Sequence, residues 1–213
     1  MDTLSLYCEV PVSAFRPQWA REYQETYPVP PPSTVYGMLL SLAGVPWQQK
    51  SRYAGVRLAL ALVGEPETHR VFRKFRRVSQ SGDPDPLAHR RPDYQDLLLW
   101  LKLWVWLTDG DADQSLIGAV TRALGPDRCG NRRYGGLSLG ESSHLVDYLA
   151  VRQPDGPARY LRRAEDGPLY LPVWVVHQRD PDGETVLEHF ELSDESPAAV
   201  PEASSPCWAK IGP

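Results

Sequence analysis

The chain is poor in cysteine, and its three cysteines are spread too widely to build a covalent or metal-bound framework. Cys8, Cys129 and Cys207 are odd in number, and no two of them form a C-x-x-C pair. Zinc sites and disulfide scaffolds need clustered cysteines, so the sequence predicts neither. Scattered free thiols are typical of a reducing compartment, which predicts a cytoplasmic protein.

The chain also lacks the common motifs of metal-dependent and nucleophilic catalysis. Its five histidines follow no metal-ligand spacing, and neither H-E-x-x-H nor G-x-x-x-x-G-K-[ST] is present. Residues Gly136 to Gly140 match the letters of a nucleophile elbow, but a strand and not a helix is expected after the serine. We therefore expect no metal, no cofactor and no enzymatic activity.

Long apolar runs and a basic N-terminal segment are absent as well. The longest apolar stretch, Leu97 to Leu107, is about half as long as a membrane-spanning helix and contains Lys102. The first ten residues carry two acids and no base, so no secretory signal is expected. These absences predict a protein that does not contact a membrane.

Charge is small in total but unevenly spread. The 213 residues carry a net charge of −4 and are 42% hydrophobic, which suits one domain with a substantial core. From Asp180 onward the chain has eight acidic residues and a single lysine, Lys210. The middle of the chain is therefore basic on balance, which is typical of a nucleic-acid-binding face combined with an acidic tail. Ordinary surface charge is the alternative, and net charge does not exclude it.

The stretch from Tyr27 to Gly44 combines a rigid entry with a short apolar helix. Its proline run fixes the backbone dihedral φ and holds the chain extended before Ser33 and Thr34. Either of these two residues is expected to cap the helix, which ends at Gly44. The helix start would present free amides and two hydroxyls, a combination that can hold a phosphate. A capped helix that binds nothing is the alternative.

Two later segments favour a nucleic-acid site. Residues 69–78 alternate apolar and basic side chains, which predicts a strand with a cationic face that includes Arg73, Lys74 and Arg76. Residues 132–142 are rich in glycine, whose missing Cβ allows backbone amides to approach a phosphate closely. Cations and a ring for base stacking accompany these glycines: Arg132, Arg133, Tyr134, Gly135 and Gly136. A solvated strand and a flexible connection are the alternatives.

Together these segments resemble the Cas-five family of the repeat-associated RAMP superfamily, a subunit of the type I CRISPR surveillance complex called Cascade. The matching stretches are Ala14 to Pro17, Tyr27 to Leu39 and Arg132 to Ser143, which lie within the first two-thirds of the chain. The resemblance implies a ferredoxin-like core, a protruding β-hairpin thumb and a role in capping the 5′ end of the guide RNA.

The order of the expected elements agrees with that implication. Helices are expected after Ser33 and after Asp111 or Asp113, between strands at residues 4–10, 56–63, 69–78, 97–107 and 144–151. The pattern predicts an α+β fold with a ferredoxin-like (RRM-type) βαββαβ core, one face of which is open to a ligand, and a hairpin arm at about residues 66–96. We expect an RNA-binding domain at 1–151 and a β-rich extension with an acidic tail at 152–213, in which residues 193–206 are loose.

The leading hypothesis is a non-catalytic RNA-binding subunit that caps the guide-bound backbone of Cascade. By the resemblance, its partners are the 5′ handle of the crRNA, the backbone subunit, the large subunit and target DNA near the protospacer-adjacent motif. The residues expected to contact RNA come from these three segments and from the stretch Ala14 to Pro17: Arg16, Ser33, Thr34, Tyr36, Arg73, Lys74, Arg76, Arg132, Arg133, Tyr134, Gly135, Gly136 and Ser138.

Two other functions stay open on the sequence alone. One branch of the family processes guide RNA without a metal, and Lys74, His89 and Tyr94 could supply acid–base chemistry near a 2′-hydroxyl, although they match no motif. A protein scaffold without RNA contact is the second alternative. The tryptophans that could supply protein contacts, or equally fill the core, are Trp19, Trp47 and Trp208.

Overall fold

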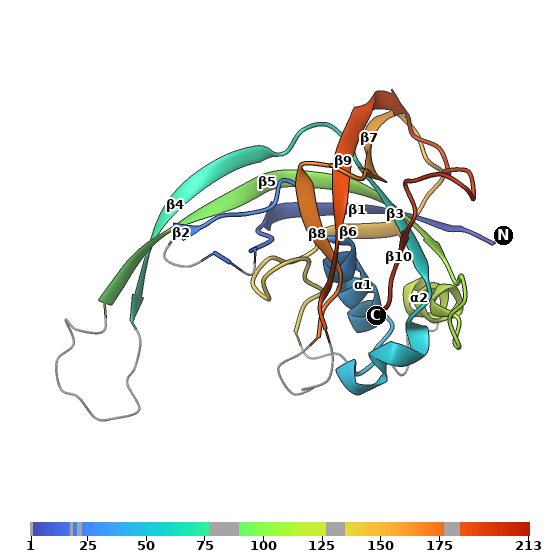
Figure 1. The fold of residues 1–213 in the computed structure, drawn as a ribbon. Coiled ribbons are helices and arrows are strands. Elements are labelled where there is room, and N and C mark those ends of the chain that lie inside the picture. Colours follow the sequence, from blue (N-terminus) through green and yellow to red (C-terminus); the bar gives the residue numbers. More distant parts are fainter. Residues whose placement is uncertain (1, 18, 21–22, 77–89, 127–134, 177–183) are drawn as a thin grey trace.

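One large sheet organises the described part of the chain, which in this computed structural model is residues 2–213 without 18, 21–22, 77–89, 127–134 and 177–183. Two α-helices and one 3₁₀-helix accompany it (Figure 1). In chain order the elements are β1 Leu4–Ser13, β2 Tyr23–Gln24, α1 Pro32–Leu42, η1 Trp47–Tyr53, β3 Arg57–Leu62, β4 Glu67–Arg76, β5 Arg90–Thr108, α2 Leu116–Leu124, β6 Tyr148–Val151, β7 Pro157–Arg163, β8 Leu169–Trp174, β9 Val186–Pro197 and β10 Ala209–Lys210.

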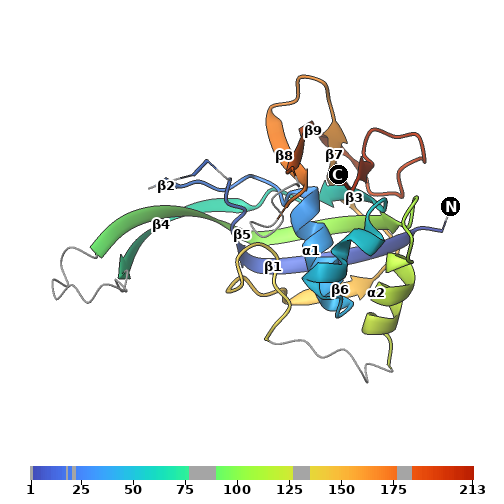
Figure 2. The same cartoon turned by 60° about the horizontal axis from the view of Figure 1, so that its bottom comes forward.

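The centre of the sheet is formed by four strands in the order β6-β1-β5-β3, each antiparallel to its neighbour. The strands β7, β9 and β8 continue the sheet beyond β3, and β10 pairs with β3 as well. Both α-helices lie on the same side of the central strands (Figures 1 and 2). The expected α+β class is therefore confirmed, with a large antiparallel sheet and few helices. No helix in the described part of the chain is both long and apolar enough to cross a membrane.

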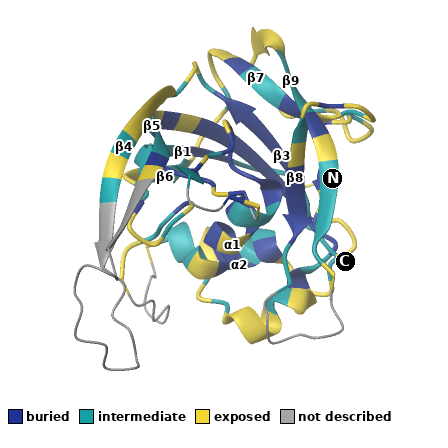
Figure 3. Cartoon of the chain, turned by 60° about the vertical axis from the view of Figure 1, so that its left-hand side comes forward, coloured by how far each residue is buried: buried dark blue, intermediate teal, exposed yellow. Residues whose placement is uncertain are grey.

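The central strands are largely buried (Figure 3), and the sheet face opposite the helices, which was expected to be open to a ligand, is covered over much of β5 and β3. On that face Lys102 and Tyr148 stay exposed, so the expected open face is confined to the part around them. Successive residues of a strand point to opposite faces. In β5 and β3 one set joins the main core beneath the helices, while Trp104 and Trp106 of β5 lie on the other face and are fully buried. Tyr160 stacks on Trp106 with ring centroids 5.5 Å apart, and Trp208 belongs to the same cluster. These large aromatic side chains occupy the face that an RNA-recognition module would leave to its ligand.

The C-terminal segment packs into the body of the protein, although its composition predicted a loose stretch at 193–206. The strand β9 continues to Pro197 and pairs with β7, where Arg159 faces Glu195. The register thus places acidic residues of β9 opposite basic residues of β7, an arrangement in which cross-strand charges attract. Farther on, Trp208 and Ile211 are 2% and 0% exposed, and Ile211 lies in the main core.

Neither helix is capped by the residue that the sequence predicted. Pro31 is the N-cap of α1 and Pro32 its first residue, so Ser33 and Thr34 lie inside the first turn and cap nothing. Proline suits that position because its missing N–H would have no acceptor within the helix. In α2 the cap is Ser115, whose hydroxyl accepts a hydrogen bond from the amide of Gly118 at 2.9 Å, and not Asp111 or Asp113.

A long hairpin of β4 and β5 leaves the body of the protein (Figures 1 and 2). The strand β5 pairs with β3 as far as Leu103 and with β4 from Leu99. Between these positions Trp100 has φ of 59°, in the left-handed region, and its side chain is 64% exposed. This unfavourable conformation for a residue with a side chain marks the point where the strand changes from sheet to arm.

We predict that the C-terminal end contributes to global stability. Ile211→Ala should lower the free energy of unfolding by about 2–5 kcal/mol, because it leaves a cavity in the main core. Val200→Ala changes a residue of the same segment that is 45% exposed, and should change stability by less than about 0.5 kcal/mol. Urea unfolding followed by tryptophan fluorescence measures both variants. Equally small effects would contradict the packed C-terminus.

Candidate nucleic-acid interface

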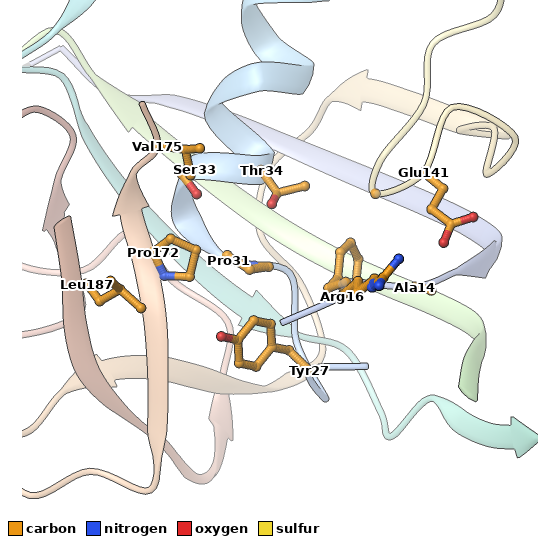
Figure 4. A pocket seen from close by; sticks show the side chains of 12 residues that line it. Ala14, Arg16, Tyr27, Pro31, Ser33, Thr34, Glu141, Pro172, Val175 and Leu187 are labelled. Carbon is orange, nitrogen blue, oxygen red and sulfur yellow. The ribbon is translucent and has the colours of Figure 1, made fainter. Parts of the chain in front are cut away.

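A cavity of about 290 Å³ lies where three distant parts of the chain meet (Figure 4). Arg16 comes from the segment after β1, and Ser33 and Thr34 come from the first turn of α1. Gly140 and Glu141 come from the end of the glycine-rich stretch, and the remaining wall includes Pro172 of β8 and Leu187 of β9. Two of the three segments that the sequence singled out therefore share one cavity.

Hydrogen-bonding groups in this cavity have capacity for a ligand. The hydroxyl of Ser33 is buried and has no hydrogen-bond partner among the described residues. An unsatisfied buried polar group costs about 1–3 kcal/mol, so a bound donor or acceptor would remove a penalty. Arg16 is exposed and donates to the carbonyl of Ala20 at 3.0 Å. Its guanidinium carries five N–H donors, and one bond to a carbonyl leaves room for a phosphate.

The glycine-rich stretch reaches the cavity because two residues hold it against the end of β1. Gly140 has φ of +97°, and a Cβ added to it would lie 2.5 Å from the carbonyl oxygen of Ala14. No other residue fits there without a shift of backbone. Nearby, Nδ1 of His144 accepts a hydrogen bond from the amide of Ala14 at 3.1 Å. The amide of His144 in turn donates to the carbonyl of Glu141 at 2.9 Å.

The arm is connected to the same place through Glu141. Its Oε2 lies 3.6 Å from Nη1 of Arg73 on β4, and its Oε1 accepts a hydrogen bond from Nε2 of Gln95 on β5 at 2.8 Å. Arg73 also donates to Oε1 of Gln95, which closes a three-membered network. The third predicted segment therefore meets the other two at the rim of the cavity.

Arg70, a second cation of β4, is not part of the network around Glu141. It binds Asp96 and Tyr23, where the arm leaves the body of the protein. Nε of Arg70 lies 3.0 Å from Oδ1 of Asp96, and the hydroxyl of Tyr23 bonds to both residues. Although burial opposes it, hydrogen bonds from Arg70 and Tyr23 hold the pKa of Asp96 below its ordinary value. Arg70 thus joins β2 to the arm as part of a charged cluster.

Some of the residues predicted to contact RNA lie elsewhere. Tyr36 is a correction: it is 4% exposed, and its hydroxyl donates to the carbonyl of Lys50 at 2.6 Å, so we withdraw it as an RNA contact. The apolar face of α1 takes it into the core. Gly136 packs against Leu145 so closely that an added Cβ would lie 2.8 Å from that side chain, and Ser138 pairs with Leu145 in a β-bridge. Neither residue lines the cavity.

Other predicted residues cannot be placed in this site. Gly135 is exposed with φ of +77° and does not line the cavity. Lys74 and Arg76 belong to β4, but their side chains lie outside the described residues, as do Arg132, Arg133 and Tyr134 entirely. Their contacts to RNA stay predictions.

The structure adds three residues that the sequence argument missed, namely Gly140, Glu141 and His144. The glycine was part of the quoted stretch, but its need for a positive φ depends on the nearby carbonyl of Ala14. His144 was interpreted as the start of a strand. Its role depends on a partner 130 residues away, for which a single sequence carries no local signal.

Of the three residues named for acid–base chemistry, Tyr94 has a described side chain. Tyr94 is 54% exposed and packs against the ring of Phe72, with centroids 5.4 Å apart. His89 and the side chain of Lys74 lie outside the described residues. Among the described residues, no group of three or more His, Cys, Asp or Glu side chains is close enough to hold a metal ion.

We predict that His144 makes the stability of the protein depend on pH. Burial lowers the pKa of His144 below its ordinary value of 6.5, Arg73 adds to this shift and Glu141 opposes it. The unfolded chain therefore takes up this proton at a higher pH than the folded one. The stability that the neutral ring contributes is present above pH 6.5 and is lost as pH falls through the lowered pKa of the folded state.

His144→Asn offers a test because its amide oxygen can accept from Ala14 but does not titrate. Between about pH 7.5 and 5.5 the unfolding free energy of the variant should fall less than that of the unmodified chain. Urea unfolding at a series of pH values measures the difference. Identical pH dependence in the two proteins would contradict this role of His144.

Comparison with known proteins shows which family the chain resembles in sequence. The sequence profile of the family described as "CRISPR-associated protein (Cas_Cas5)" matches residues 3–115. A "CRISPR-associated protein Cas5" of Myxococcus xanthus (strain DK1622) is 36% identical over 185 residues, covering 82% of this chain and 83% of the relative.

Solved structures show the same fold at lower identity. A chain of a "CRISPR RNA-guided surveillance complex" superposes with a TM-score of 0.68 at 15% identity and covers 95% of both chains. A second structure, "Crystal structure of Cas protein", gives a TM-score of 0.53 at 16% identity, over 92% of this chain and 95% of the other. Given the profile match and the identity to a curated relative over most of its length, this chain belongs to the CRISPR-associated Cas5 family.

Proposed function

We propose that the chain is a non-catalytic subunit of a Cascade-type CRISPR surveillance complex and binds the 5′ handle of the crRNA. Membership of the Cas5 family supports the subunit role, and the fold is shared with a chain of an RNA-guided surveillance complex. The observation that carries the RNA-binding role is the cavity at which Arg16, the hydroxyls of Ser33 and Thr34 and the glycine-rich segment meet.

The chemistry of the cavity suits a phosphate of the RNA backbone. Arg16 supplies a planar fork of donors that matches phosphate oxygens, and Ser33 and Thr34 add hydroxyls. These hydroxyls belong to the first turn of α1, where the helix dipole favours an anion. The free backbone amides expected there are fewer than the sequence suggested, because Pro32 has no N–H and the amide of Thr34 donates to the carbonyl of Pro31 at 2.9 Å. The volume of about 290 Å³ is close to the lower end of the usual range for ligand sites, about 300–1,000 Å³. The cavity is therefore of a size that suits a single phosphate-bearing unit rather than a whole oligonucleotide.

The order of the elements supports a ferredoxin-like core as the scaffold of this site. Without β2 and β4, the first part of the chain runs β1, α1, β3, β5, α2, β6, which is the βαββαβ order. The corresponding strands lie side by side as β6-β1-β5-β3. We assign this core to residues 1–151, with the arm inserted at about 66–96, and the β-rich extension to 152–213.

The arm and the exposed aromatic residues suit contacts with other subunits of a cytoplasmic ribonucleoprotein. The hairpin projects from the body, so it can reach a neighbouring backbone subunit (Figure 2). Trp19 and Trp47 are 53% and 47% exposed, which makes them candidates for contacts with the large subunit, whereas the burial of Trp208 excludes it. In this arrangement the chain would cap the guide-bound backbone close to target DNA at the protospacer-adjacent motif.

The non-catalytic assignment is open to a direct check. Metal-independent RNA cleavage needs an acid and a base beside the reacting 2′-hydroxyl. In the described part of the cavity lining the ionisable side chains are Arg16, Tyr27 and Glu141, and burial raises the pKa of Tyr27 to about 12. Incubation with labelled repeat RNA and EDTA should leave the RNA intact, and site-specific cuts would contradict the proposal.

We predict that Arg16→Ala weakens binding of a labelled 5′-handle RNA in a salt-dependent manner. A plot of log affinity against log salt concentration should lose about 0.7 from its slope, because one phosphate contact to a single strand is removed. Arg122→Ala is the matched control, since Arg122 is an exposed arginine of α2 that does not line the cavity. Fluorescence anisotropy at a series of salt concentrations measures both, and equal slopes in the two variants would contradict the site.

A further inference from the structure

A carboxylate occupies the place where the proposed site should be most cationic. Glu141 lines the cavity together with Arg16 (Figure 4). Its two oxygens meet Arg73 at 3.6 Å and Gln95 at 2.8 Å. The side chains of Glu141 and Arg73 are 33% and 36% exposed, whereas Gln95 is 1% exposed. The ion pair of Glu141 and Arg73 is therefore accessible to solvent, while the amide donor of Gln95 beside it is buried.

The donors that Glu141 engages are those that a phosphate would use. Guanidinium and amide N–H groups bind carboxylate and phosphate oxygens with the same geometry. A fixed negative charge beside an RNA strand would repel each phosphate that approaches it, so the carboxylate is unfavourable for the bound state. Before RNA binds, the Glu141 carboxylate accepts the hydrogen bond of Gln95 and balances the charge of Arg73. The carboxylate is favourable in this state because an unpaired buried amide would be costly.

The backbone around Glu141 is held independently of its side chain. Gly140 lies against the carbonyl of Ala14, and the amide of His144 donates to the carbonyl of Glu141. Rotation of the Glu141 side chain can therefore release Arg73 and Gln95 without moving the segment away from β1. A rotamer change of one side chain is therefore enough for the release, and no motion of the segment as a whole is needed.

We propose that Arg73 and Gln95 form a second phosphate subsite, and that Glu141 occupies it as an internal substitute until a phosphate of the guide RNA displaces it. The inference rests on the proposed function, because it takes the ligand to be the same RNA strand that enters beside Arg16. It assigns the arm a direct role, since the displaced carboxylate leaves two donors of β4 and β5 facing the RNA. Binding thereby becomes a competition between an RNA phosphate and Glu141.

Glu141→Gln tests the competition while preserving shape and the hydrogen bond to Gln95, because the new side chain keeps an acceptor oxygen. Its affinity for labelled handle RNA should be about two- to fivefold higher than that of the unmodified chain, as expected for loss of a partly exposed ion pair. Asp155→Asn removes an equal charge from the Arg152–Asp155 pair at 3.2 Å, outside the cavity lining. It should change affinity by less than about 1.5-fold, the range expected for a distant screened charge.

A double-mutant cycle separates competition for Arg73 from simple repulsion. In an Arg73→Gln background, the gain from Glu141→Gln should shrink to less than about 1.5-fold, since the cation that the carboxylate withholds is gone. Equal gains with and without Arg73 would mean that Glu141 only repels RNA, and would overturn the subsite. Unchanged or weaker binding of Glu141→Gln would overturn it as well, and would assign Glu141 a purely structural tie between arm and segment.

The outcomes distinguish this inference from the proposed function. If handle RNA binds and Arg16→Ala reduces the salt slope while Glu141→Gln has no effect, the cavity stands and the second subsite fails. If Arg16→Ala has no effect on binding, the proposed function fails first. Urea unfolding of each variant at the assay pH confirms that the comparisons are made on folded protein.

Discussion

The site depends on one contact between parts of the chain that are 130 residues apart, where the glycine-rich segment meets the end of β1 at Ala14. Gly140 lies against the carbonyl of Ala14, and Nδ1 of His144 accepts from its amide. Both backbone groups of Ala14 are thus approached by the same segment, one sterically and one by a hydrogen bond. This contact brings Glu141 to the cavity, and through Glu141 the arm is tied to the same place. A buried neutral histidine and a glycine with positive φ therefore determine whether three separate segments form a single surface.

Large aromatic side chains on the sheet face opposite the helices limit where a ligand can bind. Trp104 and Trp106 are fully buried on the face opposite the helices, beneath Tyr160 and the C-terminal segment. The flat face that RNA-recognition modules use for base stacking is thereby covered over much of β5 and β3. The proposed site lies instead at the end of the central sheet, where β1 finishes, α1 begins and the arm departs. A site at that position is dominated by backbone ends and charged side chains, so it is better suited to a phosphate backbone than to base faces.

Local patterns predicted the elements, and long-range contacts decided the details. The alternation in residues 4–10 and the apolar run at 56–63 correctly indicated β1 and β3, because each pattern expresses burial on a strand. The proline run correctly placed the start of α1, but Pro31 and Pro32 took the cap and first position that were expected for Ser33 or Thr34. Burial of Tyr36 could not be foreseen, since its partner Lys50 lies in the 3₁₀-helix that follows α1.

The acidic end was expected to be loose, yet pairing of β9 with β7 gives it basic neighbours. Two of the chosen segments line one cavity, and the third is tied to its rim. The residue that connects them, Glu141, is an acid, and acidic residues are not expected to contact RNA.

The central claim is that one RNA strand contacts the segment after β1, the start of α1 and the segment at Gly140 together. Photocrosslinking of handle RNA that carries a single 4-thiouridine, in the assembled ribonucleoprotein, with mass spectrometry of the attached peptides, tests this most directly. The account predicts that crosslinks at one or two adjacent nucleotide positions fall on peptides containing Arg16, Ser33 and Gly140. Crosslinks confined to the opposite side of the sheet, for example to peptides containing Tyr148 or Tyr160, would contradict it.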